Sequence, residues 1–73
     1  MPVTGEKPFS IMAHSFVISA SGQGYTLNYS ADGTSWTAWS EATPANENCV
    51  VNGVPKGMLY KLVGNTDTVE ITF

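Results

Sequence analysis

The chain has no arginine, one cysteine, one histidine and no long hydrophobic run. Three lysines stand against six Asp and Glu residues, which gives a formal net charge of -3 at pH 7. Binding nucleic acid requires several cations to displace condensed counterions, so we do not expect nucleic acid as a partner. A single Cys excludes an intrachain disulfide, and one Cys with one His cannot supply a zinc quartet.

Membrane and export signals are also sparse. The apolar runs are far shorter than the ~20 residues that a helix needs to cross a bilayer. No basic segment followed by an apolar one stands at the beginning of the chain, as it does in a secretory signal. We therefore expect a soluble protein with no signal peptide and no membrane partner.

The length of 73 residues predicts one small domain. A chain of this size buries only about 60% of the surface that its unfolded form exposes. Without a disulfide or a metal, such a domain lies near the lower limit of independent stability, and assembly into a larger particle would add burial.

Residues with catalytic chemistry are few and dispersed. His14 is the only candidate general base, and the sequence nominates no nucleophile or orienting partner for it. Cys49 lies in a strand pattern with no basic neighbour in sequence, which is typical of a small buried hydrophobic residue. The six carboxylates do not form the dense loop that calcium requires. We expect no enzyme activity, no catalytic residue, no cofactor and no metal.

The hydrophobic pattern predicts an all-β fold. Gly or Pro interrupts every window in which a helix could start, and turn signals recur at intervals of roughly ten residues. These features favour six to seven short strands in a small antiparallel β-sandwich, Ig-like or jelly-roll-like, and leave open whether the sheet closes into a barrel. We expect an extended N-terminal arm over residues 1–8 and a single β-sandwich domain over residues 9–73.

The first strand pattern changes phase along its length. Phe9 and Ile11 fall on odd positions, whereas Phe16 and Ile18 fall on even ones, so a regular strand would turn one pair outward. A bulge or a break into two strands near His14 would keep both pairs inside.

A hairpin is predicted in the middle of the chain. Tyr29 ends an alternating strand, and Asp32-Gly33 has the composition of a tight turn. Trp36 and Trp39 follow at a spacing of three, which places their rings on opposite faces of a regular strand. We expect Trp36 to pack on Tyr29 and Trp39 to lie outside.

The segment Met58–Val63 carries apolar residues on both faces, which is typical of a strand covered on both sides. If Tyr60 faces the core, its odd-numbered neighbours face a partner. Together with the arm and the outer tryptophan, they form the expected partner contact: Pro2, Val3, Lys7, Trp39, Leu59, Lys61 and Val63.

The run from Tyr29 to Trp36, Tyr-Ser-Ala-Asp-Gly-Thr-Ser-Trp, is followed later in the chain by Tyr60-Lys61-Leu62-Val63-Gly64-Asn65. Together the two segments resemble a pattern of small immunoglobulin- or fibronectin-like β-sandwich modules. Such modules occur in bacteriophage virion proteins and in surface proteins of gut bacteria, and the resemblance covers roughly residues 25 to 73. It implies a structural role for Tyr29, Asp32, Gly33 and Trp36, with the Tyr and Trp rings packed across the hairpin.

Two functions follow as hypotheses. The first is a non-enzymatic structural protein of a phage particle, a capsid decoration or fibre-anchoring protein that contacts capsid or other virion proteins, in multiple copies or as a homo-oligomer. The alternative is a carbohydrate-binding or adhesion module that stacks sugar rings on Trp39 and a neighbouring Tyr.

Overall fold

A computed structural model describes residues 1–20, 22–39 and 46–73, and these residues form eight β-strands and no helix. The expected all-β class is confirmed, with short N-terminal strands raising the strand number above the expected six to seven. The strands are β1 (Pro2–Thr4), β2 (Phe9–Ser10), β3 (Ser15–Ile18), β4 (Thr26–Ser30), β5 (Thr37–Ala38), β6 (Cys49–Asn52), β7 (Leu59–Val63) and β8 (Thr68–Thr72).

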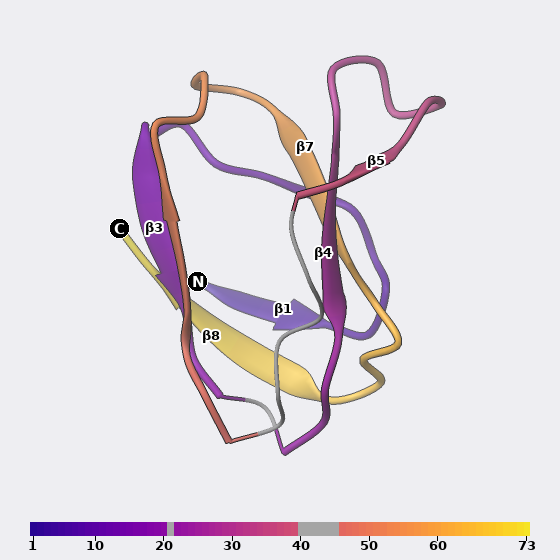
Figure 1. The fold of residues 1–73 in the computed structure, drawn as a ribbon, viewed down its shortest axis with the longest axis vertical. Coiled ribbons are helices and arrows are strands. Elements are labelled where there is room, and N and C mark those ends of the chain that lie inside the picture. Colours follow the sequence, from indigo (N-terminus) through magenta and orange to yellow (C-terminus); the bar gives the residue numbers. More distant parts are fainter. Residues whose placement is uncertain (21, 40–45) are drawn as a thin grey trace.

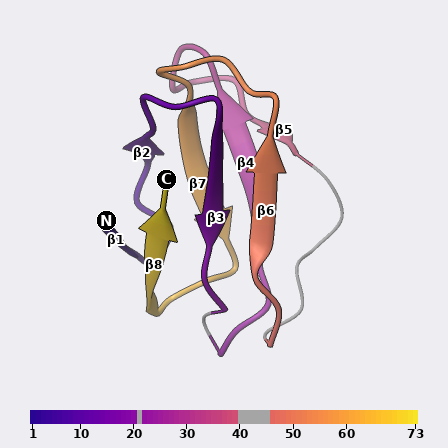
Figure 2. The ribbon, with the colours of Figure 1, turned by 90° about the vertical axis from the view of Figure 1, so that its left-hand side faces the viewer.

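The strands make two antiparallel four-stranded sheets that face each other (Figure 1). One sheet has the order β1-β8-β3-β6, and its β8, β3 and β6 lie side by side toward the viewer in Figure 2. The other has the order β2-β7-β4-β5. The described chain is therefore a small antiparallel β-sandwich. Each sheet has one face toward the other sheet and one face toward solvent.

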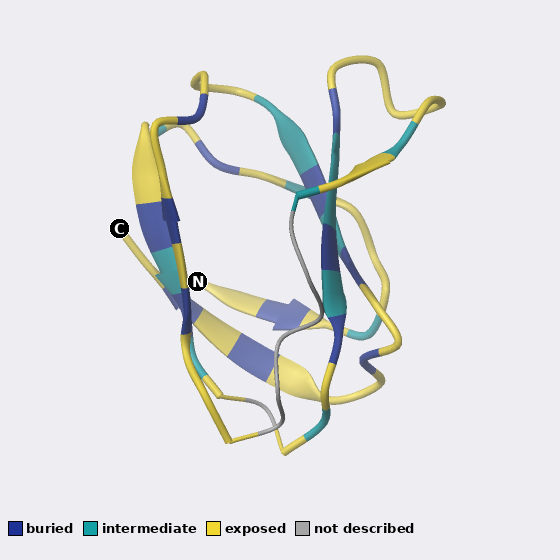
Figure 3. Cartoon of the chain, in the orientation of Figure 1, coloured by how far each residue is buried: buried dark blue, intermediate teal, exposed yellow. Residues whose placement is uncertain are grey.

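The core lies between the two sheets. Buried residues alternate with exposed ones along β6 and β8 (Figure 3), as expected when successive side chains of a strand point to opposite faces. The buried apolar residues come from both sheets and from the segments between strands: Val3, Ile11, Phe16, Ile18, Tyr25, Leu27, Cys49, Val51, Val54, Tyr60, Leu62, Val69 and Ile71.

The phase change in the first strand pattern is a break between the two sheets. β2 pairs with β7, whereas β3 pairs with β6 and β8, so the chain crosses from one sheet to the other between them. After the crossing, even positions face the core in place of odd ones. Ile11, Phe16 and Ile18 are all at most 2% exposed, which confirms the expected break.

Three aromatic rings join the sheets at the centre of the core. Phe9 stacks on Tyr60 with ring centroids 5.8 Å apart, and Phe16 from the facing sheet meets Tyr60 edge-on at 5.0 Å. The Tyr60 hydroxyl is buried and makes no hydrogen bond with any described residue. Burial raises the pKa of Tyr60 above its ordinary value of 10.0, because the phenolate would be poorly solvated there.

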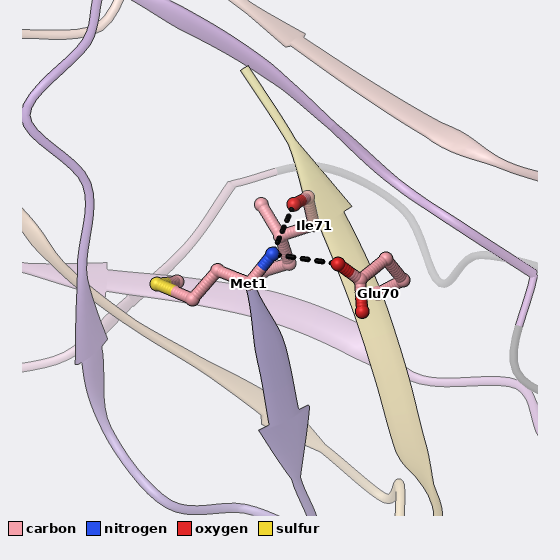
Figure 4. Close-up of polar contacts among 3 residues, drawn as sticks. All are labelled: Met1, Glu70 and Ile71. Carbon is pink, nitrogen blue, oxygen red and sulfur yellow. Dashed lines mark hydrogen bonds and ion pairs between the residues drawn. The ribbon is translucent and has the colours of Figure 1, made fainter.

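The N-terminal segment differs from the expected extended arm. Residues 2–4 form an edge strand, in which Pro2 lies opposite Glu70 and Val3 lies opposite Val69. The Met1 ammonium lies 2.7 Å from Glu70 Oε1 and donates to the Ile71 carbonyl at 2.9 Å (Figure 4). In this register Val3 lies opposite Val69, and both side chains are buried on the inward face of the sheet. Burial of Val3 therefore favours the pairing.

Candidate interaction surface

The outer face of the β2-β7-β4-β5 sheet carries three of the seven residues expected at a partner contact, and all three belong to β7. Tyr60 and Leu62 in β7 are fully buried in the core. The alternating residues Leu59, Lys61 and Val63 point to the opposite face, where Val63 is 36% exposed and the other two are half-buried. The direction of the β7 side chains is therefore as the sequence predicts.

Trp36 lies over this outer face and contacts Lys61. The Lys61 ammonium is 4.4 Å from the centroid of the Trp36 ring, within the range of a cation–π interaction. Both residues are half-buried. We call Trp36, Leu59, Lys61 and Val63 the Trp36 face.

The turn before Trp36 is held by side-chain oxygens. Asp32 Oδ1 accepts hydrogen bonds from the backbone N–H groups of Thr34 at 2.8 Å and Ser35 at 3.0 Å. The Ser30 hydroxyl donates to the same oxygen at 3.0 Å and accepts from the Gly33 N–H at 2.8 Å. The Ser35 N–H bond, followed by those of Thr34 and Ser30, holds the pKa of the Asp32 carboxyl below its ordinary value of 3.8.

Gly33 brings this turn against the Trp36 face. Its φ of 80° lies in the left-handed region that favours glycine. A Cβ atom at this position would lie 3.2 Å from Leu59 Cδ1, which is tight. The turn thus covers part of Leu59.

The two tryptophans lie on the faces opposite to those we expected. Thr37 stands opposite Tyr29 in the β4–β5 pair, so Trp39, two residues further on, shares the inward face with Tyr29. Their rings meet edge-to-face with centroids 6.1 Å apart, and Trp39 packs against the core. The expectation that Trp36 packs on Tyr29 was therefore wrong, because the register of β5 brings Trp39 to that place.

An amide oxygen on the same sheet has no hydrogen-bond partner among the described residues. Asn28 lies between Lys61 and Ala38 in the register of β7, β4 and β5. Its Oδ1 atom is buried and makes no hydrogen bond with any described residue. Such an atom costs about 1–3 kcal/mol relative to a satisfied one.

The N-terminal residues do not join the Trp36 face. Val3 is 6% exposed and contributes to the core of its own chain. The expectation that Val3 contacts a partner was therefore wrong. Pro2 and Lys7 are exposed, but Pro2 belongs to the other sheet.

His14 and Cys49 have local structural explanations. The His14 Nδ1 atom is hydrogen-bonded with the Val54 carbonyl oxygen at 2.8 Å. Cys49 is buried on the inward face of β6, as expected for a small hydrophobic residue. Residues 1–20, 22–39 and 46–73 contain no pocket, no cluster of three metal-binding side chains and no helix long enough to cross a membrane.

Two valines on the outer face of the other sheet were not among the expected contact residues. Val17 lies opposite Val50 in the β3–β6 pair, and Val50 is 59% exposed. The signal was present in the run Cys49-Val50-Val51, which is apolar at successive positions and must therefore turn one valine outward.

Searches of protein-family models, of curated proteins and of solved structures find no match to this chain.

Proposed function

We propose that the chain is a non-enzymatic structural protein of a bacteriophage virion, a capsid-decorating or fibre-anchoring component that binds another virion protein. The observation that carries this proposal is the Trp36 face. It joins an aromatic ring, two aliphatic side chains and one cation on the outside of a sheet. Trp is enriched among the residues that dominate binding energy at protein interfaces, and a sheet holds such residues in fixed positions.

The charge of this face favours an acidic partner surface. Lys61 is the only charged residue in the described strands β2, β4, β5 and β7, on a chain whose formal net charge is -3. The Trp36 ring keeps the ammonium close to the sheet, so less side-chain freedom is lost when a partner carboxylate approaches.

The assignment to a virion rests on the sequence resemblance and on size. The Tyr29 to Trp36 hairpin is the segment that resembles modules of virion proteins, and it carries the ring at the centre of the Trp36 face. A domain of 73 residues without a disulfide gains burial when it docks on a larger particle.

Binding to particles tests this function. Virions of the phage whose genome carries the gene, prepared without this chain, are incubated with the purified protein and sedimented. We expect saturable binding that falls roughly 10-fold or more in Trp36→Ala and in Lys61→Glu, since truncated hot-spot residues cost at least about 2 kcal/mol. Lys56→Glu makes the same charge change at an exposed residue outside the Trp36 face and is expected to bind like the wild type.

Carbohydrate binding is the alternative function, and it can be tested with the same purified protein. That hypothesis used Trp39 as the stacking platform, but the Trp39 ring packs on Tyr29 and against the core. Titration with simple sugars is expected to leave tryptophan fluorescence unchanged. A saturable shift in emission would replace the virion function with a sugar-binding one.

A further inference from the structure

Four described strands lie at the edges of the two sheets, and three of them are poorly suited to pair with another chain. An open edge offers backbone N–H and C=O groups to a further strand, and natural sheets blunt such edges with short strands, prolines or charges. β2 and β5 have two residues each. β1 has three residues and begins with Pro2, which has no backbone N–H to donate.

Within the described residues, the fourth edge strand, β6, has none of these three protections. It spans the four residues Cys49–Asn52 and contains no proline and no charge. The neighbouring residues Asn48, Gly53 and Val54 are uncharged as well. Figure 2 shows β6 beside β3, at the end of the sheet opposite to β1.

The outer face of this sheet carries an uncharged row of β-branched residues that ends at β6, the last described strand of the sheet. Thr72 in β8 lies opposite Val17 in β3, and Val17 lies opposite Val50 in β6. Val17 is half-buried between its neighbours, whereas Val50 is 59% exposed. A further strand beside β6 would cover the side of Val50 that the row leaves open.

We propose that β6 pairs antiparallel with β6 of a second copy of this chain, with Val50 opposite Val50. Residues directly opposite in an antiparallel pair lie on the same face of the sheet. A two-fold axis at Val50 therefore places Cys49 opposite Val51 of the second copy, both toward the cores. The β-branched row then continues through both copies on the outer face.

The chemistry of the edge is complementary to that of a second copy of this chain. In this register Asn48 meets Asn52, and every other position of β6 meets an apolar residue. Self-pairing thus brings no charge opposite another charge, although each chain has a formal net charge of -3. The pairing makes one continuous sheet from the two β1-β8-β3-β6 sheets. It leaves the Trp36 face, which lies on the other sheet, free for a different partner.

The oligomeric state of the purified chain tests the pairing. Sedimentation equilibrium over a range of concentrations is expected to show a monomer–dimer equilibrium for the wild type. Val50→Lys places two ammonium groups opposite each other and is expected to weaken the dimer roughly 100-fold. Because Val50 is exposed in the single chain, the folded monomer is retained, which circular dichroism verifies. Val63→Lys makes the same change on the other sheet and is expected to dimerise like the wild type.

A cross-link tests the register. In a Cys49→Ser background, Val50→Cys is expected to form an interchain disulfide under mild oxidation, because side chains opposite in an antiparallel pair have Cβ atoms close enough for one. Val63→Cys in the same background is expected to remain a thiol. A wild type that is monomeric at every concentration, a dimer that Val50→Lys does not weaken, or a Val50→Cys variant that does not cross-link would overturn the proposal. Particle binding through the Trp36 face is measured separately, so failure of either proposal is recognised without the other.

Discussion

The Lys61 ammonium lies 4.4 Å from the centroid of the Trp36 ring, on the face of the β2-β7-β4-β5 sheet that points away from the core. On the inward face of the same sheet, Trp39 meets Tyr29 edge-to-face. The two tryptophans, only three positions apart, therefore take different parts. Trp36 belongs to the surface, and Trp39 helps to hold the sandwich together.

Alanine substitution of each tryptophan distinguishes the surface role of Trp36 from the core role of Trp39 by its effect on the free energy of unfolding. Trp39→Ala removes a ring that packs on Tyr29 and the core, and we expect a loss of about 2 kcal/mol in the free energy of unfolding. Trp36→Ala removes a half-exposed ring and one cation–π contact, and we expect a loss below about 1 kcal/mol. Urea unfolding followed by circular dichroism measures both. Equal losses, or a larger loss for Trp36→Ala, would contradict the assigned faces.

The Tyr60 hydroxyl is predicted to contribute nothing favourable to stability. It is buried without a hydrogen-bond partner among the described residues, while its ring contacts Phe9 and Phe16. We expect Tyr60→Phe to be neutral or to stabilise the fold by up to about 1 kcal/mol, since it removes an unsatisfied polar atom and keeps the ring. Tyr60→Ala, which removes the ring as well, is expected to cost about 3–5 kcal/mol. A clear loss of stability in Tyr60→Phe would show that the hydroxyl has a partner.

Tyr60 also predicts the response to alkaline pH. Its pKa in the folded chain is raised above 10.0, so the unfolded chain loses the proton first as the pH rises. Stability is then unaffected by this group below about pH 10 and decreases above it. The decrease is expected to be shallower in Tyr60→Phe. Unfolding midpoints of the two proteins, measured at matched pH values from neutral to alkaline, test this difference.

Asp32 predicts the opposite trend in acid. Its pKa is below 3.8 in the folded chain, because backbone N–H groups and the Ser30 hydroxyl bond the carboxylate. The stabilisation is present above the unfolded value and is lost as the pH falls through the folded pKa. Asp32→Ala is expected to be less stable at neutral pH and to lose less on acidification. Unfolding midpoints of the wild type and Asp32→Ala, measured from neutral to acidic pH, test this difference. If both proteins lose the same stability on acidification, Asp32 does not have this role.

Two glycines with similar backbone angles make a matched pair. Gly33 and Gly53 have φ values of 80° and 71°, so alanine at either position costs about 1 kcal/mol in the left-handed region. A Cβ at Gly53 meets nothing within 4 Å, whereas one at Gly33 lies 3.2 Å from Leu59 Cδ1. Gly33→Ala is therefore expected to be the more destabilised variant in thermal unfolding. If the two variants unfold alike, the turn does not rest on Leu59.

The alternation of side chains made much of the fold predictable from the sequence. The regular alternation at β4 and β8 indicates their buried faces directly, and the phase change near His14 indicates a break. The N-terminal strand could not be predicted, because three residues with one apolar side chain carry no pattern and form a strand only through pairing with β8. Whether such a short segment forms a strand depends on its pairing with a strand that is distant in sequence.

The candidate surface was predictable in part for the same reason. The outward direction of Lys61 and Val63 follows from the burial of Tyr60 and Leu62 on one strand. The positions of Trp36 and Trp39 depend on which residue of β5 stands opposite Tyr29, and spacing alone shows only that the rings lie on opposite faces. The register between β4 and β5, in which Thr37 lies opposite Tyr29, places Trp39 on the inward face.

The proposed virion function is tested most directly by footprinting the chain on purified particles. Hydroxyl-radical labelling, with quantitative mass spectrometry of the same sample, measures copy number and the exposure of each side chain. We expect a fixed ratio of this chain to the major capsid or fibre protein, with Trp36 and Val63 protected on the particle and labelled in the free protein. Absence of the chain from the particle, or equal labelling of Trp36 and Val63 in both states, would contradict the proposal.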